Sequence, residues 1–183
     1  MFTSRILFSF LAIGAVSVAA SPAPIIAKRA DVSDILTVVS TLNSTTATIL
    51  PQIDALVASN SANEDSITPL ITDLASALGT ATTSLASLQG ADTSTGGSAD
   101  DVAAAIAPVV AGIATSLSGL ETAVPTLTSL LSGLGLDTSL NQVLSGLETL
   151  LAGVLNLVAT LLVDVAGLLR SLAFGLTLAS LGL

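Results

Sequence analysis

The sequence predicts an all-α protein, built as a helical bundle or as a loose set of long amphipathic helices. Apolar residues recur at alternating steps of three and four along most of the chain, which is the spacing of a helix with one apolar face. No segment carries a competing strand pattern, and runs of β-branched residues are short. From residue 127 to residue 183 leucine is so frequent that the C-terminal helical region is predicted to be nearly all apolar.

Two helices are predicted in the first half of the chain. The first covers residues 32–59, and Pro51 within it predicts a kink or a junction of two helices, because proline lacks an N–H. After a polar linker, the second covers residues 66–88, with Pro69 in the first turn, where a missing N–H costs nothing. The apolar seam of the first helix consists of Val32, Ile35, Val39, Leu42, Thr46, Ile49, Ile53 and Leu56.

The second half is predicted to hold two further helical regions. Ser98 is the expected N-cap of a third helix, whose apolar stripe runs from Val102 to Leu127 and which ends at the glycines 133 and 135. Pro108 and Pro125 are expected to bend it. Asp137 is the predicted N-cap of a last region over residues 139–172, about 50 Å long if it is one straight helix.

The chain is expected to enter the secretory pathway. Residues 1–20 have the charge and apolar run of a signal peptide, with a small-residue cleavage site ending at Ala20. Residues 21–29 form a short pro-segment that ends in the dibasic pair Lys28 and Arg29, so the mature chain is expected to begin at Ala30. The alternative is that the pair is only an exposed part of a disordered arm. The predicted location is extracellular or in the cell wall.

The remaining chain divides by composition and is strongly acidic. Residues 30–90 form a polar, acidic helical half, residues 91–99 a Gly/Ser/Thr linker, and residues 100–183 a hydrophobic helical half. After processing only Arg170 stands against thirteen acidic residues, a net charge of −12. This charge argues against binding nucleic acid or anionic lipid headgroups, since both need basic residues, and it favours solubility.

The residues needed for catalysis are missing. The sequence has no His and no Cys, and its one lysine, Lys28, belongs to the pro-segment, so neither the base of a hydrolase triad nor a zinc ligand set exists. The carboxylate pairs Glu64-Asp65 and Asp100-Asp101 lie in a linker and at a helix start, where solvation and capping explain them. The chain is predicted not to be an enzyme and to use no cofactor and no metal.

Two features of the sequence indicate a glycosylated, surface-active molecule. Asn43 begins an Asn-Ser-Thr sequon, and the many serines and threonines are further candidates for O-linked sugars. Between residues 150 and 183 only Asp164 and Arg170 are charged, so the chain is an amphiphile with a polar first half and an apolar second half. The predicted surface-active face consists of Leu140, Leu144, Leu147, Leu151, Leu155, Leu162, Leu169 and Leu172.

The layout of the chain resembles a known family. The signal peptide, the dibasic Lys28-Arg29, the absence of cysteine and the order of a hydrophilic and a hydrophobic half resemble the secreted hydrophobin-like structural proteins of mushroom-forming fungi. That resemblance implies hyphal attachment to hydrophobic surfaces and support of aerial hyphae. True hydrophobins differ, because their cysteine framework is missing here. The pattern from Asp31 to Leu88 is also similar to the fungal hydrophobic-surface-binding mannoproteins, which are helical and cysteine-poor but lack so apolar a tail.

The expected function is therefore non-enzymatic adsorption or assembly at hydrophobic surfaces or the air–water boundary, with self-association and contact with cell-wall polysaccharide as further expectations. Two alternatives stay open. Thr149 to Leu169 has the length of a membrane span, with Asn156 and Asp164 as its costly members, so a C-terminal helix could anchor the protein at the cell surface. Leucine-lined helices could also hold an apolar ligand in a dry cavity.

Overall fold

The computed structural model describes residues 30–183, and this part of the chain is all-α, as predicted. It contains eight α-helices and one short 3₁₀-helix, and no strand is present among these residues. The elements are α1 Val32–Ala58, α2 Glu64–Ser87, α3 Ala99–Glu121, α4 Leu127–Gly133, α5 Leu136–Leu150, α6 Val154–Leu161, η1 Val163–Val165, α7 Ala166–Ser171 and α8 Gly175–Leu181.

The long helices begin where side chains satisfy their first backbone N–H groups. Asp31, Asn63 and Ser98 are the N-caps of α1, α2 and α3, and each forms a capping box with the residue three positions later. The α1 seam is confirmed, because its residues from Val32 to Ile53 are buried, although Leu56 is only half-buried. The helix is continuous through Pro51.

The third predicted helix is shorter than expected. It ends at Glu121, and a turn over residues 122–126 separates it from α4. Pro125 has no N–H to donate and disfavours helical geometry at Val124, so the apolar stripe continues across a break rather than a bend. The periodicity of leucine and valine predicts which face of a helix is buried, but it does not predict where the backbone leaves the helix.

The expectation of one helix over residues 139–172 is wrong. The chain leaves helical geometry at residues 151–153, where Gly153 adopts φ +94°, a conformation that favours glycine. A second break follows α6, and the segment from Val163 to Ser171 is bent by 62° from it. Asp137 is also not the N-cap of α5, because Gly135, at φ +66°, precedes the first helical residue, Leu136.

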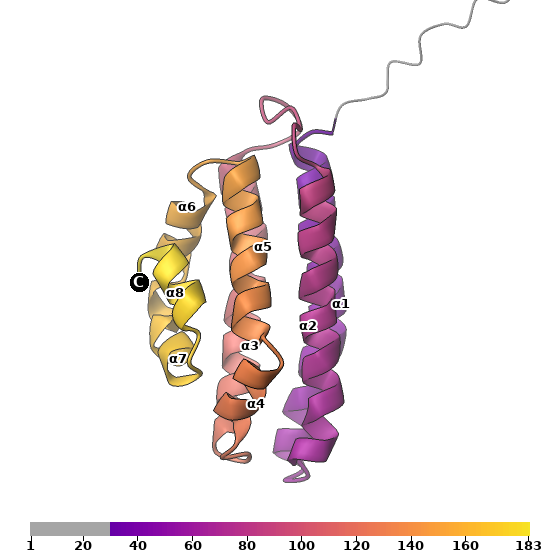
Figure 1. The fold of residues 1–183 in the computed structure, drawn as a ribbon, viewed down its shortest axis with the longest axis vertical. Helices are drawn as coiled ribbons and strands as arrows, with labels where there is room; N and C mark the ends of the chain where they lie inside the picture. Colours follow the sequence, from indigo (N-terminus) through magenta and orange to yellow (C-terminus); the bar gives the residue numbers. More distant parts are fainter. Residues whose placement is uncertain (1–29) are drawn as a thin grey trace, which may run out of the picture.

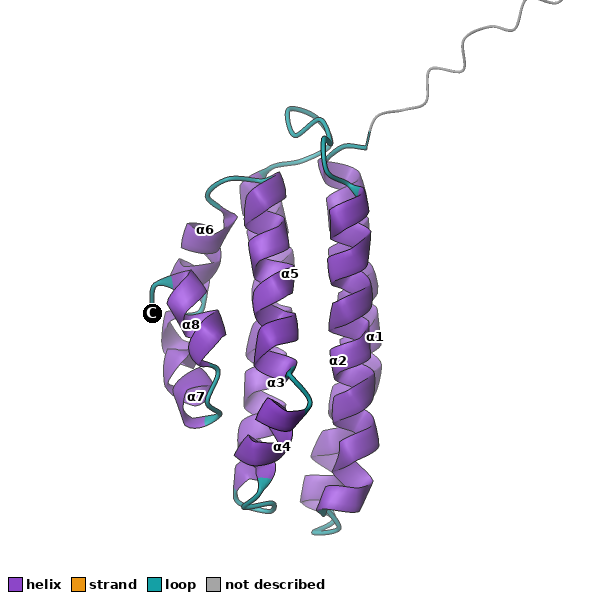
Figure 2. Ribbon diagram, in the orientation of Figure 1, coloured by secondary structure: helices purple, strands orange, loops and turns teal. Residues whose placement is uncertain are grey.

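The helices lie in three layers (Figure 1). The first layer is the antiparallel pair α1 and α2, and the second contains α3, which packs on α1, and α5, which packs on α2. The third is the C-terminal layer, defined here as residues 151–183 with α6, η1, α7 and α8. The loops between the long helices lie at their ends (Figure 2).

The C-terminal layer packs against two helices whose backbones do not approach each other closely. No Cα atom of α3 lies within 8 Å of one of α5. Instead α6 packs mainly against α3, and α8 packs against α5. Helices of all three layers contribute to a single hydrophobic core, and α3, in the middle layer, is covered by α1 on one side and by α6 and α7 on the other. This double coverage explains why α3 is apolar around most of its circumference.

Candidate functional site

The residues predicted for processing and glycosylation fall in two places. Ala20, Lys28 and Arg29 lie outside the described residues, so signal cleavage and pro-segment removal stay predictions. Asn43 lies in the middle of α1 and is exposed, next to the buried seam residue Leu42. A sugar on its amide would project into solvent, and its presence is likewise a prediction.

The leucines predicted to form the surface-active face lie in the core of the folded chain. Leu155 is half-buried, and the other members are buried, namely Leu140, Leu144, Leu147, Leu151, Leu162, Leu169 and Leu172. The first three belong to α5, and the rest belong to the C-terminal layer. In this conformation the face points inward, so it can meet an external surface only when the C-terminal layer moves away from the middle layer.

Three other apolar side chains are exposed in the folded state. Among the described residues, the large hydrophobic side chains with at least half of their surface in water are Leu161 at 55% exposed, Val163 at 60% and Leu176 at 50%. All three belong to the C-terminal layer. Their exposure does not follow from the predicted single helix over residues 139–172, because Leu161 and Val163 flank the break at Leu162. The spacing along a helix cannot identify exposed residues at a break.

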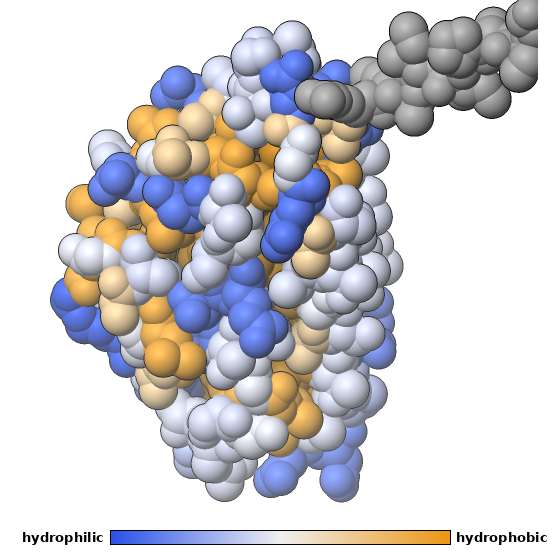
Figure 3. All heavy atoms as spheres, turned by 45° about the horizontal axis from the view of Figure 1, so that its top comes forward, coloured by the Kyte–Doolittle hydropathy of each residue, from blue (hydrophilic) through white to orange (hydrophobic). Residues whose placement is uncertain are grey.

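The distribution of polar residues over the surface follows the layers. In Figure 3 hydrophobic residues gather over the C-terminal layer at the left, and the opposite edge, over α1 and α2, is almost entirely pale or blue. Asp164 and Arg170, the two charged residues of the C-terminal layer, are both exposed. The folded molecule is therefore amphiphilic in space as well as along its sequence.

The start of the C-terminal layer is fastened to α5 by a carboxylate. The Glu148 side chain accepts hydrogen bonds from the backbone N–H of Gly153 at 2.9 Å and of Leu155 at 2.9 Å. Residue 153 is the N-cap position of α6 and, being glycine, has no side chain to cap it. Glu148, which is half-buried, satisfies these N–H groups in its place and lies where the positive end of the helix dipole favours negative charge.

The end of the C-terminal layer is fastened by a second carboxylate. Asp137 accepts from the N–H of Leu176 at 2.9 Å through Oδ2, and through Oδ1 from both the N–H and the hydroxyl of Thr177, at 2.9 and 2.8 Å. Phe174, at the N-cap position of α8, makes no side-chain capping bond. The prediction that Asp137 caps its own helix is therefore wrong, since a cap supplied from about forty residues away leaves no local pattern in the sequence.

The carboxylate pairs identified in the sequence lie in the first turns of two long helices. Glu64 and Asp65 occupy the first turn of α2, and Asp100 and Asp101 that of α3, where Asp101 completes the capping box with Ser98. Within residues 30–183 no group of three or more His, Cys, Asp or Glu side chains is placed to hold a metal ion.

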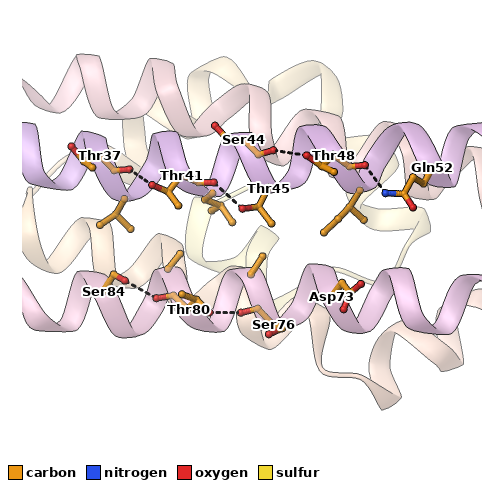
Figure 4. A pocket seen from close by; sticks show the side chains of 15 residues that line it. Thr37, Thr41, Ser44, Thr45, Thr48, Gln52, Asp73, Ser76, Thr80 and Ser84 are labelled. Atoms are coloured by element: carbon orange, nitrogen blue, oxygen red, sulfur yellow. Dashed lines mark hydrogen bonds between the residues drawn. The ribbon is translucent and has the colours of Figure 1, made fainter.

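A shallow groove of about 760 Å³ runs between α1 and α2 on the face away from the middle layer (Figure 4). Its walls carry hydroxyl groups that donate to the backbone carbonyl one turn earlier, as Thr41 does to Thr37 at 2.8 Å and Thr80 does to Ser76 at 2.9 Å. Leu42 and Ile49, both buried, are among its lining residues. Since most of these hydroxyl hydrogens are already used, the groove is a mildly polar, water-facing surface.

Two stretches of the described chain have the length and apolarity to cross a membrane. One is α3, although 56% of its most apolar window is buried inside the bundle, and the other is α6 taken with η1 and α7, which are bent by 62°. The alternative span from Thr149 to Leu169 is not a single helix, because the break at Gly153 divides it.

The fold and the surface place the chain in a class of cysteine-free, all-α proteins. Its charged residues lie mostly outside a leucine-rich C-terminal layer. A comparison with known protein families finds none that matches the chain. The chain is 43% identical over 89 residues to fruiting body differentiation protein 16 of Flammulina velutipes, an alignment that covers 46% of this chain and 69% of that protein. It therefore belongs to the same family as this fungal developmental protein.

Proposed function

We propose that the chain is a secreted, non-enzymatic structural protein that adsorbs at hydrophobic surfaces or at the air–water boundary and supports fungal adhesion and aerial growth during fruiting-body development. The observation that carries the proposal is the concentration of Leu161, Val163 and Leu176, all at least half exposed, in a layer with only two charged residues. Exposed apolar groups gathered on one part of a surface mark interaction sites. The name of the fungal relative and the resemblance to hydrophobin-like proteins support the developmental setting.

The energetics favour two stages of adsorption. The exposed side chains make first contact, since each gains free energy as soon as an apolar surface removes it from water. The C-terminal layer also holds nine large apolar side chains in the core, which is worth roughly 15–25 kcal/mol of gross burial. These are Leu151, Val154, Val158, Leu162, Leu169, Leu172, Phe174, Leu178 and Leu181. An apolar surface can bury the same groups, so release of the layer onto that surface costs far less than release into water.

The polar first layer keeps the bound molecule wettable. The hydroxyl-lined groove, the exposed Asn43 and most of the acidic residues lie outside the C-terminal layer, so a molecule bound through that layer presents them to water. A film of such molecules converts an apolar surface into a hydrophilic one, which is the property that the test measures.

The test compares the native protein with the variant Leu161→Ser/Val163→Ser/Leu176→Ser on an alkylated film. The native protein should coat the film and lower its water contact angle after washing. The variant should adsorb at least about tenfold more slowly, because each serine removes about 1 kcal/mol or more of favourable contact. The positions are exposed, so the fold is retained. A variant such as Leu162→Asp is less informative, because Leu162 is buried and the substitution destabilises the core.

A matched control adds the same number of hydroxyl groups to the first layer, at the exposed positions Ala47, Ala55 and Ala86. This Ala→Ser variant should coat the film as the native protein does. The proposal is contradicted if the native protein leaves the film unwetted, or if it is recovered only with detergent-extracted membranes. It is also contradicted if the Leu161, Val163 and Leu176 variant adsorbs as fast as the native protein.

A further inference from the structure

The C-terminal layer is placed so that it can leave without separating the remaining long helices. α1 packs on α2, α3 on α1 and α5 on α2, and none of these contacts passes through the C-terminal layer. That layer occupies the slot between α3 and α5, which have no Cα atoms within 8 Å of each other. Its departure opens the slot and leaves these three helix pairs in place.

The covalent connection on which the layer would turn is short. It consists of residues 151–153, which lie between the end of α5 and the start of α6. Gly153, at φ +94°, has nothing within 4 Å of the position that a Cβ would take, so the turn has room around it. Beyond it, the elements are only 8, 3, 6 and 7 residues long. Helices of this length are marginal alone, so their order depends on an apolar support.

Two carboxylates of α5 hold the layer in the slot. Glu148 caps α6 next to the turn, and Asp137 caps α8 near the far end. Among residues 30–183, Glu148 and Asp137 accept every side-chain hydrogen bond that joins the C-terminal layer to the rest of the bundle. Everything else that fastens the layer is apolar contact, which an apolar surface can replace, whereas these bonds cannot be replaced by such a surface.

We propose that the C-terminal layer is a releasable strap, latched by Glu148 and Asp137, which swings about residues 151–153 when the protein meets an apolar surface. The proposal rests on the proposed function and extends it by naming the contact surface. That surface is the inward leucine face of the strap, including Leu162, Leu169 and Leu172, in addition to the side chains exposed beforehand. The partner is a water–apolar boundary, and the latches set how readily the strap opens.

A reversible covalent lock tests the proposal. The sequence has no cysteine, and Thr177 Oγ1 already lies 2.8 Å from Asp137 Oδ1, so Asp137→Cys/Thr177→Cys places two thiols at the far latch. The oxidised form should adsorb to an alkylated film at least about tenfold more slowly than the same protein after reduction. Thiol titration establishes that the bond has formed. Equal rates for the two forms overturn the strap while leaving the proposed function intact.

The control lock joins elements outside the strap. Thr126 Oγ1 lies 3.4 Å from Glu64 Oε2, so Glu64→Cys/Thr126→Cys places two thiols between α2 and the turn before α4, and thiol titration again establishes that they have joined. Oxidising this protein should leave the adsorption rate unchanged, and slowing equal to that of the strap lock overturns the proposal. If the native protein does not adsorb at all, the proposed function itself fails, and the two failures are therefore distinguishable.

A second pair of variants gives an independent readout without a disulfide. Asp137→Ala/Glu148→Ala removes both latches, and Asp65→Ala/Asp100→Ala removes two first-turn acids that form no hydrogen bond to the strap. Both variants change the net charge equally. The latch variant should adsorb roughly tenfold faster and show faster hydrogen exchange at the amides of Leu176 and Thr177, with native behaviour in the control. Native adsorption and exchange in the latch variant overturn the proposal.

Discussion

The contribution of Asp137 to stability can be worked out from its contacts. The half-buried carboxylate accepts three hydrogen bonds from α8, of which two come from backbone N–H groups at 2.9 Å. Asp137→Ala leaves the N–H of Thr177 without a partner, because Thr177 is fully buried and water does not replace the carboxylate there. Hydrogen bonds to a charged acceptor are worth about 1.5–3 kcal/mol, and loss of a helix cap costs about 1 kcal/mol. A total near 2–3 kcal/mol is therefore expected.

The assay is thermal unfolding followed by circular dichroism at a helix wavelength. For a domain of this size the expected loss corresponds to a fall in Tm of roughly 4–10 °C. Asp65→Ala is the matched control, because Asp65 also lies in the first turn of a long helix but is exposed and caps no other element. Its Tm should change by about 2 °C or less. Equal shifts for the two variants would show that Asp137 acts only through its own helix, and the reasoning about α8 would be refuted.

Three further outcomes follow from packing and charge. Gly96→Ala should destabilise the fold by about 2 kcal/mol or more in chemical denaturation, because residue 96 has φ +86° and its Cβ would lie 2.8 Å from the Asp31 carboxyl group. Gly90→Ala should cost clearly less, because residue 90 has the same φ but its Cβ would lie in open space. Phe174→Ala should cost about 3–5 kcal/mol in the same measurement and Leu176→Ala almost nothing, since the first side chain is 1% exposed and the second 50%. Light scattering should rise as the pH falls from about 7 towards the isoelectric point near 4.1, because the net charge of −12 that keeps copies of the processed chain apart is lost. Flat scattering would contradict this.

The sequence predicted the buried faces of the long helices well because burial and periodicity have the same cause. A residue such as Ile35 or Leu74 is buried because it lies on one side of a helix, and that side repeats every three to four residues. The start of the third helix was predicted for a similarly local reason, since Ser98 and Asp101 lie three apart and satisfy each other's backbone groups.

The breaks and the long-range caps were not predictable in this way. A leucine-rich stretch looks continuous whether or not Gly153 turns the chain, and Asp137 looks like the cap of its own helix until α8 is folded against it. The exposed positions of Leu161 and Val163 depend on the same breaks. The helix breaks, the long-range cap and the exposed side chains all depend on tertiary structure and so could not be predicted from local sequence patterns. The same features form the candidate interfacial surface.

The broken geometry of the C-terminal layer has a consequence for the balance between its two states. One continuous leucine-rich helix would be rigid, and only one of its sides could face the slot between α3 and α5. Four short elements and the turns that join them instead place nine large apolar side chains in the core and leave few of that kind in water. On an apolar surface those side chains find equivalent burial, and the large terms nearly cancel when the faces of α3 and α5 that the layer uncovers are buried on the same surface. The small terms then decide which state is populated: the hydrogen bonds to Asp137 and Glu148 favour the closed strap, and the exposed Leu161, Val163 and Leu176 favour the surface.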